Sequence, residues 1–383
     1  MKKERILSVD MLRGLVMVIM ALDHVRDYSS MYHFDPEDLT QSNFILFLTR
    51  WVTHYCAPVF MFVAGVGTGL GEIGGKTKKQ ISHFLWTRGL WLVLLEVTVI
   101  RFSWFFNFDY SNVFLMVIWA LGISMIFLAA IIYLPKKTIL IGGLIMVFGH
   151  NLVDSIDPES LGAWSPLWKV FHTRSFIPMG SFNIAIIYPL VPWIGVMALG
   201  YVFGESIYRQ EREVRQRNLL IIGSVLTGLF ILIRGINVYG DMNPWSVQPT
   251  FTMTIASFLN TTKYPPSLSY LLMTIGPAIL TLYVFEKVKG PVAEFLIVIG
   301  RVPMFYYVLH IYLIHLFSVA LGLYQGFSLS EMMQPFFMYP QDFGYGLPVS
   351  YALWIIVVAI LYPLCKWYMN LKKRKSHPLF SYI

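Results

Sequence analysis

The chain has 383 residues, of which 56% are hydrophobic and 13% are charged, and its formal net charge is +8. Soluble domains carry about 25% charged residues, so this composition excludes a soluble globular protein and predicts an integral membrane protein. The basic excess does not indicate nucleic-acid binding, because the Lys and Arg residues cluster in short loops between apolar runs.

Ten apolar runs are candidates to cross the bilayer as helices, for which about 20 residues are needed. The predicted spans are residues 8–28, 45–70, 82–102, 112–133, 138–152, 184–206, 218–238, 267–285, 293–320 and 347–370. The first run follows the basic segment MKKER and lacks a signal-peptidase site, so we expect it to be retained. The expected fold is a single all-α multi-pass domain over residues 1–383.

The charge of the loops predicts the orientation of these helices. With the N-terminus in the cytoplasm, the cytoplasmic segments include GGKTKKQ, RQEREVRQR and the basic tail, while external loops such as HFDPEDL are acidic. Short basic loops stay in the cytoplasm, so both termini are predicted to be cytoplasmic. Cys56 and Cys365 then lie near opposite faces and form no disulfide, and no Cys/His spacing indicates a metal site.

The first run, DMLRGLVMVIMALDH, places ionisable residues at membrane depth. Arg13 and His24 are eleven residues apart, which is about three helical turns, so they share one face about 16 Å apart along the axis. Such residues are candidates for function. Asp10 lies one turn before Arg13 and is a possible ion-pair partner. The alternative is a structural ion pair at one end and a hydrogen-bonded histidine at the other.

Other helices repeat this distribution of arginine and histidine. His54 and His310 are expected in the outer half with His24, and Arg88 and Arg301 in the inner half with Arg13. Arginines near the cytoplasm suit a phosphate-bearing cosubstrate, and histidines suit general acid–base catalysis near neutral pH. Snorkelling arginines and interfacial aromatic belts are the structural alternatives. The remaining candidates, all for substrate binding, are Asp10, Asp23, His33, Arg50, Asn260, Lys263, Ser267 and Ser269. For Ser267, the alternative is a helix N-cap.

Several of these segments resemble membrane acyltransferases. SVDMLRGLVMVIMALDH, APVFMFVAGVGTGL, WTRGLWLVLLEV and GRVPMFYYVLHIYLIHL are similar to segments of the acyltransferase-3 type, and YPLVPWIGVMALGYVFG and NTTKYPPSLSYLLMT resemble the heparan-α-glucosaminide N-acetyltransferase family in its bacterial branch. The resemblance covers nearly the whole chain. It implies transfer of an acetyl group from cytoplasmic acetyl-CoA to a glucosamine-type amine across the membrane, and the bacterial branch implies the cell's inner membrane as the location. From the residues themselves, we expect His24 or His54 to be the general base, and the sequence does not rank these two against His33.

We therefore expect an acyl-CoA-dependent acyltransferase that acts on an amine or hydroxyl of a sugar-type acceptor. Acyl-CoA is a cosubstrate, and no tightly bound cofactor is expected. The expected partners are the lipid bilayer, acyl-CoA and a glycan or amino-sugar acceptor, and a homodimer is an open option. The alternatives are a permease for a small anion or lipid or polysaccharide precursor, and a non-enzymatic subunit for envelope assembly.

Overall fold

The computed structural model describes residues 5–374. Residues 1–4 and 375–383, which carry part of the basic termini predicted to be cytoplasmic, lie outside the described residues. The helices are α1 (Leu7–Ser29), α2 (Phe44–Trp51), α3 (Cys56–Ile73), α4 (Lys78–Leu95), α5 (Arg101–Phe105), α6 (Val117–Ile131), α7 (Lys136–Gly149), α8 (Ser165–Phe171), α9 (Leu190–Tyr208), α10 (Arg212–Ile236), α11 (Phe251–Leu259), α12 (Leu268–Phe285), α13 (Pro291–Gly300), α14 (Pro303–Gln325), α15 (Leu329–Met332) and α16 (Leu347–Arg374). The strands are β1 (Asn112–Leu115), β2 (Ser175–Pro178) and β3 (Asn183–Ile186).

Within the described residues, eight helical segments are long and apolar enough to cross a membrane. They are Phe44–Ile73, Lys78–Phe105, Lys136–Val153, Leu190–Tyr208, Arg212–Ile236, Leu268–Phe285, Pro303–Gln325 and Leu347–Arg374. The predicted multi-pass, mostly helical membrane fold is thereby confirmed. Helices α6 and α13 are apolar but shorter, and α1, which carries several charged residues along its 23-residue length, is not among the eight.

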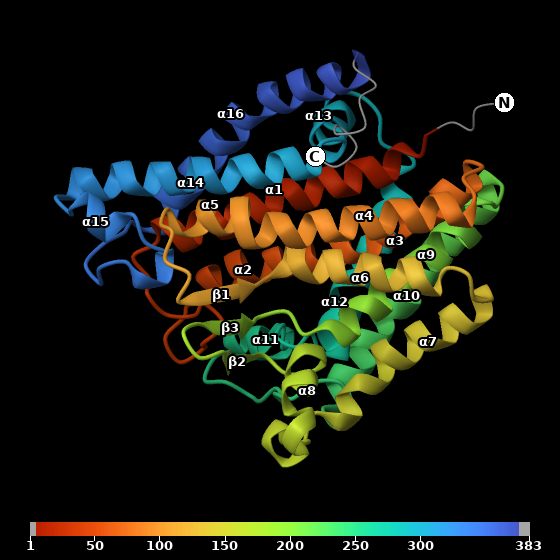
Figure 1. The fold of residues 1–383 in the computed structure, drawn as a ribbon, viewed down its shortest axis with the longest axis horizontal. Coiled ribbons are helices and arrows are strands. Elements are labelled where there is room, and N and C mark those ends of the chain that lie inside the picture. The colour runs from red at the N-terminus through yellow and green to blue at the C-terminus, as the bar shows by residue number, and fades with distance from the viewer. Residues whose placement is uncertain (1–4, 375–383) are drawn as a thin grey trace.

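Helix α1 runs through the middle of the bundle (Figure 1). It packs against α3, α12, α13, α14 and α16. Most of its residues are buried, including the charged residues Asp10, Asp23 and Arg26. A helix that is buried on most sides places its ionisable residues inside the protein, where each needs a partner.

Helices α3 and α9 pack closely through small residues. A Cβ added to Gly69 would lie 2.5 Å from the backbone nitrogen of Glu205, and one added to Gly204 would lie 2.6 Å from the carbonyl oxygen of Val66. Gly65 and Gly200 meet the facing backbone in the same way. The AGVGTG segment therefore serves helix packing, because small residues let two membrane helices approach each other closely.

Two predicted spans begin as strands rather than helices. Residues 112–115 form β1 and residues 183–186 form β3; these two pair in parallel, and β2 pairs with β3 in the antiparallel direction. The prediction of continuous helices from residues 112 and 184 was wrong at these ends, because an apolar run does not by itself distinguish a strand from a helix. The small sheet also lay outside the predicted all-α class.

The predicted helix at 293–320 is two helices. Helix α13 ends at Gly300 and α14 begins at Pro303, with Arg301 and Val302 between them. Proline lacks a backbone N–H and disfavours helical dihedrals at the residue before it, and Val302 has φ −132° and ψ 49°. The break places Arg301 beside the first turns of α1, where its Nε lies 3.4 Å from a carboxylate oxygen of Asp10.

Candidate functional site

A cavity of about 520 Å³ lies among α1, α3, α4, α6 and α14. It is lined at one end by cations and at the other by Asp23, His24 and Lys263. We call these the basic end and the histidine end. The cations of the basic end are Arg5, Arg13, Lys76, Arg88, Arg301 and Lys372. Arg13 and His24, whose spacing predicted a shared helix face, both line this cavity.

Asp10 is buried behind the basic end and binds three of its arginines. Its buried carboxylate forms ion pairs with Arg5 at 2.6 Å, with Arg13 at 3.3 Å and with Arg301 at 3.4 Å. Arg13 also donates a hydrogen bond of 3.1 Å to the carbonyl oxygen of Gly300. The shared carboxylate holds guanidinium groups from two distant segments at one place, and it balances only part of their charge.

Two further cations of the basic end flank one aromatic ring. The Lys76 ammonium lies 5.6 Å and the Arg88 guanidinium 5.7 Å from the ring centre of Phe84, which also lines the cavity. Both cations are within cation–π distance of the ring, so the basic end combines positive charge with an aromatic surface. The basic end can therefore accommodate a group that combines phosphates with an aromatic base.

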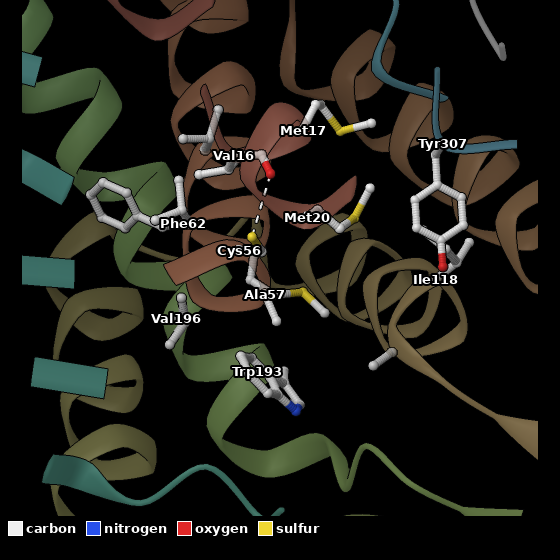
Figure 2. Close-up of a cluster of buried hydrophobic side chains, with 14 of the residues drawn as sticks. Val16, Met17, Met20, Cys56, Ala57, Phe62, Ile118, Trp193, Val196 and Tyr307 are labelled. Atoms are coloured by element: carbon white, nitrogen blue, oxygen red, sulfur yellow. Dashed lines mark hydrogen bonds between the residues drawn. The ribbon is translucent and has the colours of Figure 1, made fainter. Parts of the chain in front are cut away.

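The middle of the cavity has an apolar wall that is shared by several helices. Figure 2 shows Met17 and Met20 of α1, Cys56 and Ala57 of α3 and neighbouring side chains in this region. The Cys56 thiol donates to the carbonyl oxygen of Val16 at 3.4 Å. Flexible methionines and small residues such as Ala57 and Gly67 leave space for a thin chain between the two ends.

At the histidine end, His24 contacts two rings from other segments. Its Nδ1 lies 2.8 Å from Nε2 of His310, and its ring centre lies 4.9 Å from that of Trp104 in an edge-on arrangement. His310 is fully buried and does not line the cavity. The two histidines that were predicted as catalytic on separate helices are thus in direct contact, and one of them faces the cavity.

An ion-pair network surrounds Asp23 at the same end. Arg50 donates two hydrogen bonds to its carboxylate at 2.8 and 2.6 Å, and Arg26 pairs with it at 2.9 Å. Arg50 also binds Glu37 at 2.8 Å, and His54 Nε2 lies 2.7 Å from the same Glu37 oxygen. Burial of Glu37 favours its neutral form, but the charges of His54 and Arg50 outweigh burial and lower the pKa of Glu37.

Lys263 differs from these cations, because its ammonium lies 5.2 Å from the ring centre of Tyr264 rather than beside a carboxylate. It is 7% exposed and lines the cavity, and among residues 5–374 the structure shows no hydrogen bond or ion pair to its ammonium. The flanking loop is held rigidly, because Asp241 accepts hydrogen bonds from Thr262 and Ser267. A buried ammonium with this geometry can stabilise negative charge in the cavity.

The other predicted site residues lie outside the cavity wall. His33 Nε2 lies 2.8 Å from the carbonyl oxygen of Phe343, and Asn260 donates to the carbonyl oxygen of Glu37. Ser267 accepts from the backbone N–H of Tyr270 as the N-cap of α12, and the buried hydroxyl of Ser269 has no hydrogen-bond partner among the described residues. His54 and Arg50 reach the cavity indirectly, through Glu37 and Asp23.

Several cavity residues escaped the sequence analysis. Arg5, Lys76 and Lys372 belong to the basic segments whose charge was interpreted as a signal of orientation, and that interpretation hid their place at the basic end. Tyr188 and Tyr307 line the cavity but resemble interfacial aromatic residues in the sequence. A search for cations near the inner ends of several helices could have found Lys76. No local pattern distinguishes the two tyrosines.

The arrangement suits transfer of a group over a distance. Guanidinium and ammonium groups at the basic end can bind phosphates, the apolar wall can hold a thin chain, and the imidazole of His24 can accept or donate a proton. Among the described residues, no cluster of His, Cys, Asp or Glu could hold a metal ion.

Comparison with known proteins identifies one family. The model of the family described as "Heparan-alpha-glucosaminide N-acetyltransferase, catalytic" matches residues 5–233, which is more than half of the chain. This segment contains Arg13, His24 and Arg88, whereas Lys263, Arg301 and His310 follow it. No curated protein matches the sequence.

Proposed function

The chain belongs to the heparan-alpha-glucosaminide N-acetyltransferase family, and on this premise we propose that it transfers an acetyl group from cytoplasmic acetyl-CoA to an amine or hydroxyl of a sugar-type acceptor at the external face. The observation that carries this proposal is that one cavity has cations at one end and His24 at the other. A substrate with phosphates, a thin linker and a reactive thioester matches the basic end, the apolar wall and the histidine end in that order.

The basic end is proposed to bind the phosphates of acetyl-CoA. Arg13, Arg88 and Arg301 are the principal contacts, and Lys76, Lys372 and Arg5 add positive charge. Asp10 keeps three of these arginines at one place. The pantetheine arm then extends along the apolar wall past Cys56, so that the thioester reaches the histidine end.

His24 is proposed as the general base. Its imidazole takes a proton from the acceptor amine or hydroxyl, whose nitrogen or oxygen attacks the thioester carbonyl. Lys263 stabilises the negative charge that develops on the carbonyl oxygen. When the carbon–sulfur bond breaks, the CoA thiolate receives the proton held by His24. The products are the acetylated acceptor and CoA.

An acyl-histidine intermediate is the alternative chemical route. The acetyl group would first pass to His24 and then to the acceptor, with release of CoA before the acceptor reacts. Incubation with labelled acetyl-CoA in the absence of acceptor separates the two routes. Label that stays on the denatured protein indicates the acyl-histidine, and its absence in an active preparation indicates direct transfer.

The function is tested with the purified protein, acetyl-CoA and a panel of amino sugars that begins with glucosamine. CoA release and the acetylated product are measured together. We expect His24→Gln to lower kcat by about 100- to 10,000-fold. His54→Gln should cost less, because the Nε2 of His54 is engaged by Glu37 and the residue does not line the cavity.

The exposed His83 of α4 provides the matched control, since it lies outside the cavity wall. His83→Gln should retain wild-type activity. Failure of the wild-type protein to bind acetyl-CoA, or wild-type activity in the His24→Gln variant, would overturn the proposal.

A permease for a small anion is the second candidate, because the arginines and His24 line one continuous cavity that could serve as a transport path. In that case, the arginines would bind a small anion and His24 would relay protons. Uptake of a labelled anion into proteoliposomes without acetyl-CoA would favour this function over acetyl transfer.

A further inference from the structure

The hydrogen bonds of His310 determine which of its nitrogens carries the proton. Its Nδ1 lies 2.5 Å from the carbonyl oxygen of Tyr307 and 3.2 Å from that of Tyr306, one turn earlier in α14. A carbonyl oxygen only accepts hydrogen bonds, so Nδ1 of His310 must carry a hydrogen. In a neutral imidazole, Nε2 is then an acceptor.

The surroundings of His310 favour this neutral ring. His310 is 0% exposed and stacks against Tyr306 with ring centres 5.5 Å apart. Among the described residues, no carboxylate forms an ion pair with it. A buried imidazolium without a counter-ion would be costly. His310 therefore offers a lone pair at Nε2.

This lone pair defines the tautomer of His24. His24 Nδ1, at 2.8 Å from His310 Nε2, must donate the hydrogen bond between them. The neutral His24 ring consequently carries no hydrogen on Nε2, the nitrogen on the other side of the ring from His310. The rings of the two histidines lie 21° from parallel, and the edge contact with Trp104 restricts rotation of His24.

We propose that His310 is a positioning residue that holds His24 in the tautomer with an unprotonated Nε2 toward the cavity, an inference that rests on the proposed role of His24 as the base. The Tyr307 carbonyl oxygen orients His310, and His310 orients His24, through successive hydrogen bonds. In a catalytic triad, the base is likewise held in one tautomer by a hydrogen-bonded partner. Here the orienting partner is uncharged. When Nε2 of His24 accepts a proton, Nδ1 continues to donate to His310, and no proton passes to His310.

The test compares two substitutions at position 310. His310→Leu removes the acceptor, so Nδ1 and Nε2 of His24 compete for one proton, and we expect kcat to fall by about 10- to 100-fold. His310→Gln places an amide oxygen near the position of the lost Nε2 and should recover most of this loss. KM for acetyl-CoA should change little in either variant, because His310 does not line the cavity.

Tyr306→Phe is the matched control, because Tyr306 packs against His310 but makes no hydrogen bond to His24. It should retain wild-type kcat. A second control is the double variant His24→Ala, His310→Leu. If His310 acts through His24, His310→Leu lowers the residual activity of His24→Ala no further.

A spectroscopic readout tests the tautomer independently of activity. Nitrogen NMR of protein with ¹⁵N-labelled histidine distinguishes protonated from unprotonated ring nitrogens, and the His24→Ala variant assigns the His24 signals. We expect Nδ1 of His24 to be protonated and Nε2 to be unprotonated in the wild-type protein, and a mixture of both tautomers in His310→Leu.

A protonated Nε2 in the wild type, or an undiminished effect of His310→Leu in the His24→Ala background, would overturn the role of His310 while leaving acetyl transfer intact. The converse result, a wild-type protein that acetylates no acceptor but shows the expected His24 tautomer, would reject the proposed function and keep the positioning role.

Discussion

At the scale of single residues, Arg13 shows how a buried carboxylate can support a binding surface. Asp10 holds Arg13 but retains Arg5 and Arg301 when Arg13 is removed, so Arg13→Gln should fold normally. Loss of one charge-assisted contact to phosphate should weaken acetyl-CoA binding by about 10- to 100-fold. Isothermal titration calorimetry of the purified protein with acetyl-CoA measures this change.

Arg212 at the start of α10 is a suitable control for Arg13, because it is exposed and lies outside the cavity wall. Arg212→Gln should bind acetyl-CoA as the wild type does. Equal affinity in both variants would argue against a phosphate site at the basic end.

Single residues also show which parts of the site were predictable from the sequence. The eleven-residue interval between Arg13 and His24 predicted one shared face, and both residues line one cavity. For His54, the direction of the side chain was not predictable, since its contact with Glu37 depends on how the preceding loop folds back. Lys76 was missed because a basic loop has the same composition whether its lysines face water or a cavity.

At the scale of elements, the glycines of α3 and α9 explain how these helices approach each other. Gly69 faces the backbone of α9, where an added Cβ would lie 2.5 Å from Glu205 N and 2.6 Å from Tyr201 O. Gly69→Ala should therefore destabilise the protein by about 1–3 kcal/mol through overpacking. Thermal unfolding in detergent measures the loss as a lower melting temperature.

Gly142→Ala in α7 is the matched control, because nothing lies within 4 Å of the Cβ position there. Alanine has a higher helix propensity than glycine, so this variant should be at least as stable as the wild type. A melting temperature for Gly69→Ala equal to that of Gly142→Ala would contradict close packing of α3 on α9.

Element boundaries were the least predictable part of the fold. Hydrophobicity identified the long spans, because their apolar runs match the thickness of a bilayer. It did not separate β1 and β3 from the helices that follow them, since a short strand needs only a partner that is distant in the sequence. Pro303 was visible in the sequence, but whether a proline kinks a helix or divides it depends on packing around Arg301.

At the scale of the whole molecule, the cavity connects ionisable groups from segments that are far apart in the chain. Helix α1 contributes to both ends, α3 and α6 supply the apolar wall, and Arg301 and Lys263 arrive from the second half. A buried central helix can place a cation and a histidine at opposite ends of one cavity because it is surrounded on most sides. The function proposed for this cavity requires that a ligand fills its middle.

Cys56 reports on that requirement, because it lines the middle of the cavity, whereas the buried Cys365 does not. In a Cys365→Ser background, a small thiol reagent should modify Cys56 slowly, and saturating acetyl-CoA should reduce the rate at least about tenfold by excluding the reagent.

A larger side chain that fills the middle of the cavity should have the same effect as the ligand: Gly67→Leu should also slow the modification of Cys56 and abolish acetyl transfer. A Cβ at Gly67 meets only an Arg13 nitrogen at 3.9 Å, so the larger side chain can enter the cavity without displacing a helix. Gly142→Leu in α7, where nothing lies within 4 Å of the Cβ position, should change neither property. Mass spectrometry of the modified peptide measures the rate, and a rate that acetyl-CoA leaves unchanged would show that the bound cosubstrate does not pass Cys56.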